Sequence, residues 1–157
     1  MAQLLRRHFA IDKNNQVLNL SRSGEKGWIF WDGKSLGDWA KVIDGCDVVI
    51  NLAGRSVDCR YTQANLKEMM DSRVESTRAI GQAIECAHRP PKLWLQMSTA
   101  TIYSHRFDRA NDEGSGEIGG NEPNVPAYWS YSIEIAKAWE AELAKAKTTD
   151  TRKVAMR

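Results

Sequence analysis

The stretch that most restricts the fold of this chain is residues 47–54, with the sequence DVVINLAG. Val48, Val49 and Ile50 are β-branched, and the apolar run that they begin is too short for a helix. A short run that is apolar on both faces is typical of a strand buried in the middle of a parallel sheet. Ligands of open α/β sheets bind at the carboxyl ends of the strands. The small residues that end this run are therefore candidate cofactor contacts, the alternative being a core strand followed by an ordinary turn.

Composition limits the classes of protein to consider. At 157 residues the chain is long enough for one domain with a sizeable core. The 22 basic and 20 acidic residues nearly cancel, so we expect no nucleic-acid or anionic-membrane partner. No apolar run approaches the roughly 20 residues that a membrane span requires, and residues 1–7 lack the apolar core of a signal peptide. We therefore predict a cytoplasmic protein.

The cysteines and histidines give no sign of a disulfide framework or a metal centre. The three cysteines are odd in number and scattered along the chain, which fits a reducing compartment. The three histidines are equally scattered, with no pair at the spacing of metal ligands. We predict no metal site.

Strand-like and helix-like patterns alternate along the chain. Besides residues 47–54, strands are predicted over residues 16–20, 28–31, 92–98 and 153–156. Helices are predicted over residues 2–10, 35–43, 62–87 and 130–147, and a long loop over residues 106–128. This alternation predicts an α/β fold with a doubly wound parallel sheet and helices on both faces.

Hydroxyl side chains cluster where the strand at residues 92–98 ends. Ser98, Thr99 and Thr101 follow one another closely. Hydroxyls at such an edge can hydrogen-bond a carbonyl or alcohol oxygen and stabilise charge that develops on it. The alternative is turn chemistry, because Ser and Thr are common wherever strands end. Their place at the end of a central strand favours a functional role.

An ordered set of short motifs runs along most of the chain. The motifs are LSR at residues 20–22, WDG at 31–33, NLAG at 51–54, DSRV at 71–74, Ser98-Thr99 and Trp139-Glu140. Together they resemble the extended short-chain dehydrogenase/reductase family. Within it, they are most similar to an atypical branch of NAD(P)-dependent epimerases and dehydratases that includes nucleoside-diphosphate-sugar epimerases. The resemblance implies a Rossmann-like sheet that binds NAD(P).

The resemblance also assigns cofactor contacts. It places Leu52, Ala53 and Gly54 beside the adenosine-diphosphate half of the dinucleotide. Arg22 follows the strand whose end meets the adenosine ribose, where an acidic residue favours NAD and an arginine suits a 2′-phosphate. We therefore expect NADP, with NAD as the alternative. The alternative is that Arg22 is simply a solvent-exposed arginine at a strand end, without a cofactor role.

The catalytic residues carried over from the resemblance are incomplete. Thr99 takes the catalytic Ser/Thr position, with Ser98 beside the nicotinamide. Lys137 falls at the family lysine, which holds the nicotinamide ribose. The family's catalytic tyrosine lies four residues before that lysine, and the residue there is Ile133. Tyr131 lies six residues before Lys137 and, at about 100° per residue, faces elsewhere. The usual proton donor for hydride chemistry is missing.

The first strand and glycine-rich loop of the family are also missing from this sequence. The loop binds the pyrophosphate through backbone amides and the following helix. Residues 1–157 therefore read as a single, partial NAD(P)-binding Rossmann domain, without the C-terminal substrate-binding portion. The missing strand belongs between the strands at residues 16–20 and 47–54. Each backbone group left buried and unpaired there costs about 1–3 kcal/mol, against a total stability of roughly 5–15 kcal/mol. Either the two neighbours pair, a partner chain fills the gap, or the chain folds poorly.

Three functions are consistent with these residues. The first is an NAD(P)-binding epimerase or dehydratase that acts on a nucleotide-sugar or similar polar small molecule. The second is a catalytically silent dinucleotide-fold module that serves as a sensor or interaction surface. The third is a non-functional gene remnant. The gap in the sheet also makes a homo-oligomer a hypothesis to test.

Overall fold

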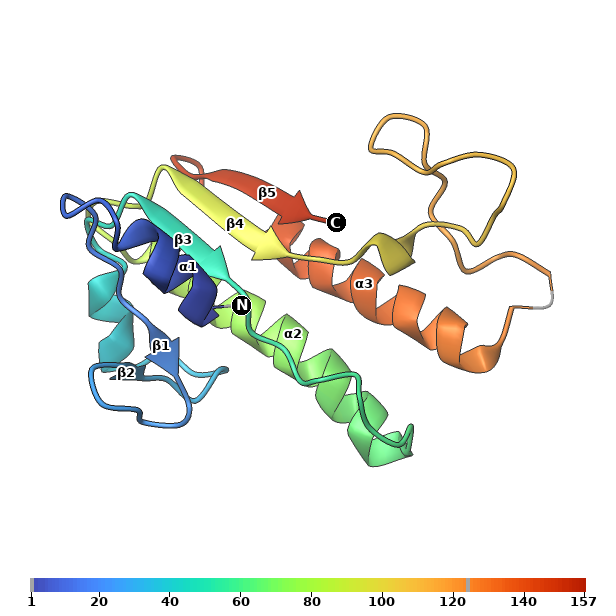
Figure 1. Cartoon of the computed structure of the whole chain (residues 1–157), viewed down its shortest axis with the longest axis horizontal. Coiled ribbons are helices and arrows are strands. Elements are labelled where there is room, and N and C mark those ends of the chain that lie inside the picture. The colour runs from blue at the N-terminus through green and yellow to red at the C-terminus, as the bar shows by residue number, and fades with distance from the viewer. Residues whose placement is uncertain (1, 124) are drawn as a thin grey trace.

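The computed structural model describes residues 2–123 and 125–157. Figure 1 labels its helices and strands in chain order. The elements are α1 (Ala2–Phe9), β1 (Leu20–Ser21), β2 (Ile29–Phe30), the 3₁₀ helix η1 (Asp38–Val42), β3 (Val48–Asn51), α2 (Gln63–Glu85), β4 (Leu93–Met97), the 3₁₀ helix η2 (Ala100–Ile102), α3 (Ala127–Lys145) and β5 (Arg152–Met156). They confirm the predicted alternation of strands and helices.

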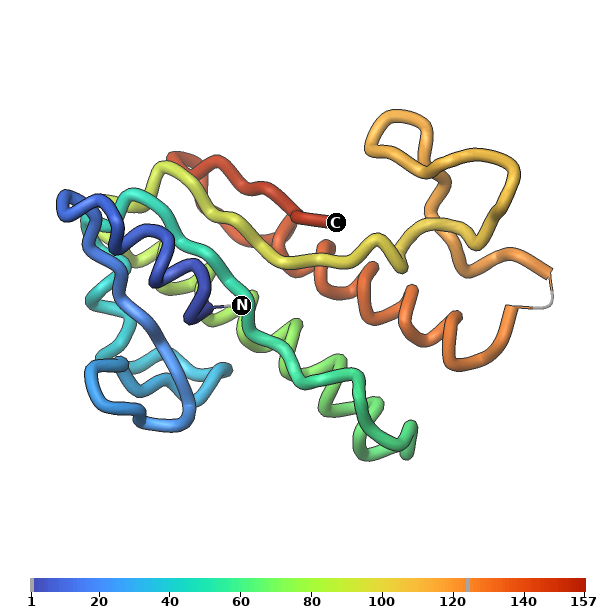
Figure 2. The backbone as a smooth tube through the Cα atoms, in the orientation of Figure 1, coloured from blue at the N-terminus to red at the C-terminus, as the bar shows by residue number. Residues whose placement is uncertain are grey.

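The strands form two separate parallel sheets. β1 pairs with β2, and β3, β4 and β5 form the second sheet in that order. In the view of Figure 1, α1 lies in front of β3, while α2 and α3 lie behind the second sheet and pack on each other. The tube in Figure 2 shows the same arrangement. These layers confirm the predicted α/β class with a parallel sheet.

The largest core cluster lies between the second sheet and the two long helices. Trp94 on β4 is fully buried at its centre. It packs with side chains of α2 and α3, among them Ile80, Ile84 and Leu143. A side chain at Gly81 would come within 3.0 Å of the Ala146 Cβ, so a glycine permits this close approach of α2 to the end of α3. The apolar periodicity of α2 is explained by this burial.

Two predictions about the strands beside the gap are wrong. The strand predicted over residues 16–20 is paired only over Leu20–Ser21, because β2 alone borders it. The strand within residues 47–54 is not in the middle of its sheet, since β3 is the first of three strands. Val48 is accordingly 45% exposed. β1 and β3 do not pair with each other, which excludes the first of the three alternatives for the gap, pairing of the two neighbouring strands.

The described residues contain neither a helix suited to span a membrane nor a cluster of metal ligands. No helix within residues 2–123 and 125–157 is both long and apolar enough to cross a membrane. Across the same residues, no group of three or more His, Cys, Asp or Glu side chains is placed to hold a metal ion.

Candidate functional site

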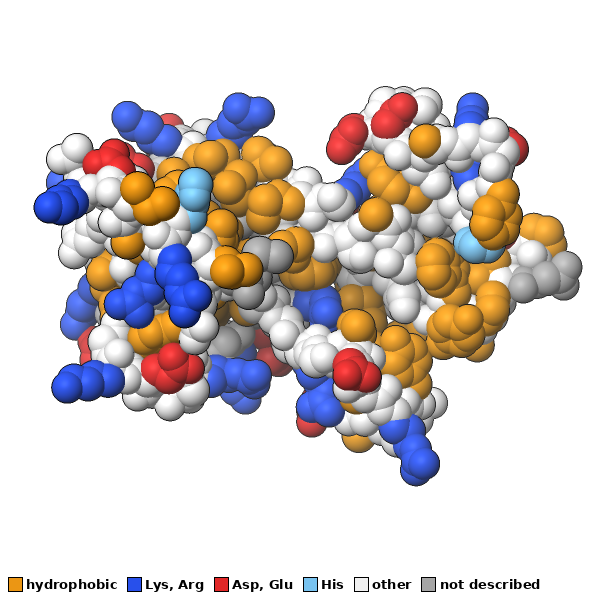
Figure 3. Space-filling view, in the orientation of Figure 1, with side chains coloured by type: hydrophobic (Ala, Val, Ile, Leu, Met, Phe, Trp, Pro, Cys, Tyr) orange, Lys and Arg blue, Asp and Glu red, His pale blue; other side chains and the backbone are white. Residues whose placement is uncertain are grey.

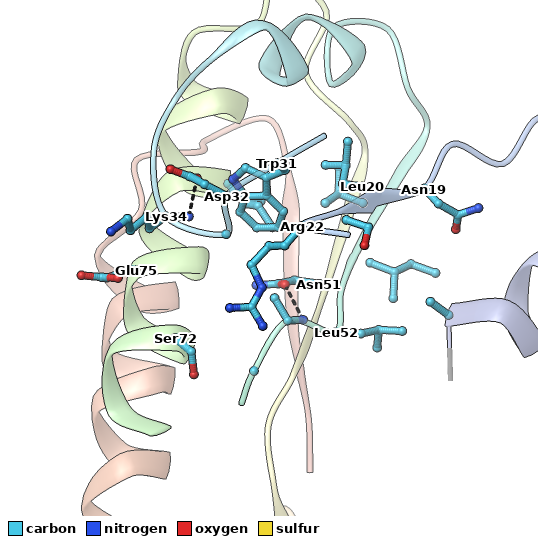
Figure 4. A pocket seen from close by; sticks show the side chains of 18 of the residues that line it. Asn19, Leu20, Arg22, Trp31, Asp32, Lys34, Asn51, Leu52, Ser72 and Glu75 are labelled. Carbon is cyan, nitrogen blue, oxygen red and sulfur yellow. Dashed lines mark hydrogen bonds between the residues drawn. The ribbon is translucent and has the colours of Figure 1, made fainter. Parts of the chain in front are cut away.

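A cavity of about 800 Å³ lies between β1 and β3, where the two sheets are separated. Figure 4 shows its lining side chains. The part of the lining that faces the interior of the molecule is apolar and includes Leu20, Trp31, Ile43 and Val49. Polar and charged side chains lie where the strands end. They are Arg22, Asp32, Lys34, Asn51, Arg55, Glu68, Asp71, Ser72 and Glu75. The cavity therefore combines an apolar wall with a polar mouth at the carboxyl ends of the strands.

Asn51 fixes the backbone that leaves β3. Its side chain is 2% exposed. Its Nδ2 donates to Gln96 Oε1 on β4 at 3.0 Å, and its Oδ1 accepts from the backbone N–H of Ala53 at 3.0 Å. These two bonds turn the chain so that residues 52–54 line the cavity. The predicted contacts Leu52, Ala53 and Gly54 thus lie together at the end of β3.

Gly54 lies against an unusual arginine of α2. A Cβ at Gly54 would lie 3.4 Å from the guanidinium carbon of Arg73. That guanidinium stacks over the Trp139 ring at 5.1 Å and donates through Nη1 to the carbonyl of Met69 at 2.9 Å. Burial lowers the pKa of Arg73, because the charged form loses hydration. Arg73 joins α2 to α3 beneath the strand end.

Two cations border the mouth of the cavity at the end of β1. Arg22 and Lys34 both line it and make no ion pair in the part of the chain that the structure describes. Figure 4 shows Lys34 beside Asp32 and the Arg22 guanidinium beside Asn51. Figure 3 shows further Lys and Arg side chains over the part of the molecule that holds α1, β1 and β2. This end of the cavity can receive an anion.

Asp32 forms no ion pair with Arg22 or Lys34 among the described residues. Its Oδ1 accepts from the backbone N–H groups of Lys34 at 2.9 Å and of Ser35 at 2.8 Å. The hydrogen bond from Ser35, followed by that from Lys34, lowers the pKa of Asp32. The carboxylate therefore stabilises its own turn. The Trp31-Asp32-Gly33 motif gave no sign that Lys34, just beyond it, lines the cavity.

Ser98 belongs to a separate polar cluster at the ends of β4 and β5. Its side chain is 6% exposed, and its Oγ donates to Glu140 Oε1 at 2.5 Å. Arg157 donates to both Glu140 oxygens, at 2.9 and 2.7 Å, and to the Tyr103 hydroxyl at 3.0 Å. This cluster joins β4, β5 and α3. Apart from the Trp139-Glu140 pair, no motif pointed to this cluster.

Glu140 makes a pH-dependent contribution to stability. Burial opposes its ionisation, but hydrogen bonds from Arg157 and Ser98 outweigh burial and lower the pKa of the carboxyl below its ordinary value of 4.5. The stabilisation is therefore present above that value and is lost as the pH falls through the lower folded-state pKa. We expect Glu140→Gln to reduce the free energy of unfolding by about 1–3 kcal/mol at pH 7.

Urea denaturation at several pH values measures this effect. The difference between Glu140→Gln and the original chain should shrink as the pH falls below the ordinary carboxyl pKa of 4.5. Glu134→Gln is the matched control, because Glu134 lies on the same helix and is exposed. An equal difference at acidic and neutral pH would contradict a role for the ionised carboxylate.

The two predicted catalytic residues make internal hydrogen bonds. Thr99 Oγ1 donates to Thr101 Oγ1 at 2.9 Å and accepts from the Thr101 N–H, so it caps η2. Lys137 Nζ donates to the carbonyl of Gly119 in the long loop at 2.7 Å. Neither residue lines the cavity, and neither does Ser98. The structure thus groups Arg22 with residues 52–54 but does not bring Ser98, Thr99 and Lys137 into the same cavity.

Ile133 has a packing role. It is 1% exposed on the inner face of α3. A side chain at Gly119 would lie 2.9 Å from its Cδ1, so the long loop packs directly over it. The residue four positions before Lys137 is therefore a packed core residue. Tyr131 is only partly buried.

Residues 3–138 match the sequence profile of the NAD dependent epimerase/dehydratase family. The matched segment includes both cavity-lining strand ends and most of α3. The chain belongs to the NAD dependent epimerase/dehydratase family. This assignment confirms the resemblance on which the site residues were predicted, and the two parallel sheets are a partial Rossmann fold of that family.

Curated relatives extend the comparison. The chain is 28% identical over 148 residues to the human epimerase family protein SDR39U1. This alignment covers 92% of this chain and 46% of the relative. The mouse protein of the same name is 29% identical over 160 residues, with 48% of its length covered. The chain therefore spans about half the length of the curated relatives it matches.

Solved structures show the same fold. The crystal structure of human SDR39U1 (isoform 2) with NADPH aligns with a TM-score of 0.75 at 26% identity, covering 98% of this chain and 48% of that one. UDP-glucuronic acid 4-epimerase from Bacillus cereus, solved with NAD, aligns with a TM-score of 0.66 at 13% identity over 96% of this chain and 50% of the epimerase. The second likeness concerns the fold alone.

Proposed function

We propose that the cavity between β1 and β3 binds a dinucleotide of the NADP class. The observation that carries this proposal is the pair Arg22 and Lys34, two cations at the cavity mouth without a carboxylate partner among the described residues. A 2′-phosphate supplies the negative charge that such a pair accommodates. The human relative was solved with NADPH, which supports the same choice.

The residues present fit one half of the dinucleotide. Arg22 and Lys34 suit the phosphate on the adenosine ribose, and residues 52–54 expose a backbone turned toward the cavity by Asn51. Among the described residues, the glycines that line the cavity are Gly33 and Gly54. They are far apart in the sequence, so this lining includes no glycine-rich loop for the pyrophosphate. We assign the adenosine half to this cavity.

The chemistry that we propose is transient hydride transfer from a carbinol of a nucleotide-sugar or similar polar metabolite to the nicotinamide, which would accept and return the hydride when the cofactor is bound. Because Ile133 stands at the tyrosine position, water would take up and return the hydroxyl proton. Thr99 holds the reacting oxygen through its hydroxyl. Lys137, which donates to the Gly119 carbonyl in this structure, would hold the ribose of the nicotinamide. Thr99 caps η2 just after the end of β4, and Lys137 lies on α3.

A catalytically silent dinucleotide-binding module is the second candidate. It is favoured by the internal bonds of Ser98 and Lys137 and by the burial of Ile133 at the tyrosine position. In this form, dinucleotide binding reports the NADP state of the cell without hydride transfer. Dinucleotide binding is common to both candidates.

Calorimetric titration of the purified chain with NADPH and NADH tests the proposal. We expect a dissociation constant in the micromolar range for NADPH and at least about tenfold weaker binding of NADH, since the two differ by the phosphate. The absence of any heat of binding up to about 1 mM NADPH would overturn the proposal and leave the gene remnant as the remaining hypothesis.

A further inference from the structure

Arg73 on α2 is a cation that the proposed dinucleotide cavity does not use. It does not line that cavity, and it forms no ion pair among the residues that the structure describes. Burial lowers the pKa of Arg73, Tyr61 opposes this effect, and no carboxylate contributes to it. A partly buried charge without a counter-ion is costly. An anion that pairs with this guanidinium would therefore make an interaction that the described chain leaves unmade.

The guanidinium of Arg73 is held in one orientation. Its Nη1 donates to the carbonyl of Met69 at 2.9 Å, and its central carbon lies 5.1 Å from the centre of the Trp139 ring. Trp139 is buried, and its indole N–H donates to Thr77 Oγ1 at 2.9 Å. A guanidinium that already stacks on a fixed ring loses little conformational freedom when it binds a ligand. The cation is therefore preorganised.

The edge of the guanidinium formed by Nε and Nη2 is open. Among the described residues, Nη1 is the guanidinium atom that donates a hydrogen bond, whereas Nε and Nη2 have no acceptor and are not enclosed. The chain that leaves β3 runs along α2 in Figure 1, and it brings Gly54 against this edge. A Cβ at Gly54 would lie 3.6 Å from Nε. Because glycine has no side chain, the space beside the open edge stays accessible.

The open edge lies at the carboxyl end of the sheet. Asn51 and Gln96 are the last residues that pair in the ladder of β3 and β4. Gly54 follows Asn51 by three residues, and Thr99 follows Gln96 by three residues. Arg73 thus lies against a residue that leaves the sheet at the same level as Thr99, the proposed contact of the reacting oxygen. Ligands of open α/β sheets bind beyond this edge.

We propose that the open edge of Arg73, beside Gly54, is an oxyanion-binding site that takes a phosphate or carboxylate group of a ligand. Both groups accept two parallel hydrogen bonds from one edge of a guanidinium. The group can belong to the dinucleotide or to an acidic substrate, since the recognition chemistry is the same. The site lies outside the lining of the cavity, so it does not depend on the proposed function.

Titration with small anions tests the site without a dinucleotide. The probes are inorganic pyrophosphate and glucuronate, and glucose is the uncharged control. The Nε–H signal of Arg73 in the isotope-labelled chain is followed by two-dimensional NMR, with the ionic strength held constant by sodium chloride. We expect at least one anion to shift this signal saturably, with a dissociation constant below about 10 mM. Glucose should leave the signal unchanged.

Two arginines of α2 provide matched variants. Arg73→Gln and Arg78→Gln remove the same charge from the same helix, but Arg78 is already paired with Glu142. Followed at the Gly54 amide, anion binding should weaken at least about tenfold in Arg73→Gln and less than about twofold in Arg78→Gln. Arg73→Lys should restore only part of the affinity, because an ammonium group cannot form the two parallel bonds. Unchanged anion affinity in Arg73→Gln, with a loss of stability in urea, would show that Arg73 serves packing alone and overturn the proposal.

Saturation with NADPH distinguishes the two sources of the anion. If the dinucleotide supplies it, NADPH shifts the Arg73 Nε–H signal and excludes pyrophosphate. If an acidic substrate supplies it, glucuronate still shifts the signal in the presence of NADPH. An Arg73 signal that neither anion nor NADPH shifts would overturn the proposal, even where calorimetry shows that NADPH binds to the chain. If Arg73→Gln does not fold, the Arg73 signal of the original chain decides the question.

Discussion

Replacing Trp94 with alanine is expected to lower the free energy of unfolding by about 3–5 kcal/mol. Trp94 is fully buried on the central strand of the three-stranded sheet, and it packs against the helix α2 near Gly81. Removal of its ring leaves a cavity that the surrounding strands and helices cannot fill. Domains of this size are stable by only roughly 5–15 kcal/mol. The expected loss is therefore a large share of the stability of the whole domain. Urea denaturation followed by circular dichroism measures the loss.

The control for Trp94→Ala is a large aromatic residue outside the core. Phe107 is 92% exposed in the long loop, so Phe107→Ala should change the free energy of unfolding by less than about 0.5 kcal/mol. A loss below about 1 kcal/mol for Trp94→Ala would contradict the assignment of Trp94 to a close-packed core.

Reversing the charge of Arg22 is expected to weaken NADPH binding by about 10- to 100-fold. A hydrogen bond to a charged group contributes about 1.5–3 kcal/mol, and each 1.4 kcal/mol corresponds to a factor of ten in affinity. NADH lacks the 2′-phosphate, so its affinity for Arg22→Asp should change less than about threefold. Calorimetric titration of both dinucleotides measures the difference.

Arg60→Asp is the matched control for this charge reversal. Arg60 is exposed and does not line the cavity, so its replacement changes the net charge by the same amount. NADPH affinity for Arg60→Asp should stay within about twofold of the original chain. Equal losses of NADPH and NADH affinity in Arg22→Asp would remove the case for a 2′-phosphate site at Arg22.

The local sequence pattern predicted an element well where that element packs or pairs with its neighbours in the fold. The apolar spacing of α2 and the β-branched run of β3 both correspond to observed elements. The pattern failed at residues 16–20, because a strand requires pairing and only Leu20 and Ser21 have a partner. Alternation along the chain cannot show which edge of a strand is left open.

The candidate site was predictable where it follows strand ends. Arg22 and Gly54 line one cavity because β1 and β3 end beside the same gap. The bonds of Asn51 to Gln96 and of Ser98 to Glu140 join residues more than 40 positions apart. No local spacing encodes such pairings, so the buried amide pair and the polar cluster became visible only in the fold.

The most direct measurement of the central claim is the titration of the isotope-labelled chain with NADPH, followed by two-dimensional NMR. If the cavity binds the adenosine half of the dinucleotide, the largest shifts should fall on the backbone amides of residues 21–22 and 51–54. Amides over the far end of α3 should stay unchanged. Saturable binding that leaves residues 21–22 and 51–54 unperturbed would contradict the placement of the dinucleotide in this cavity.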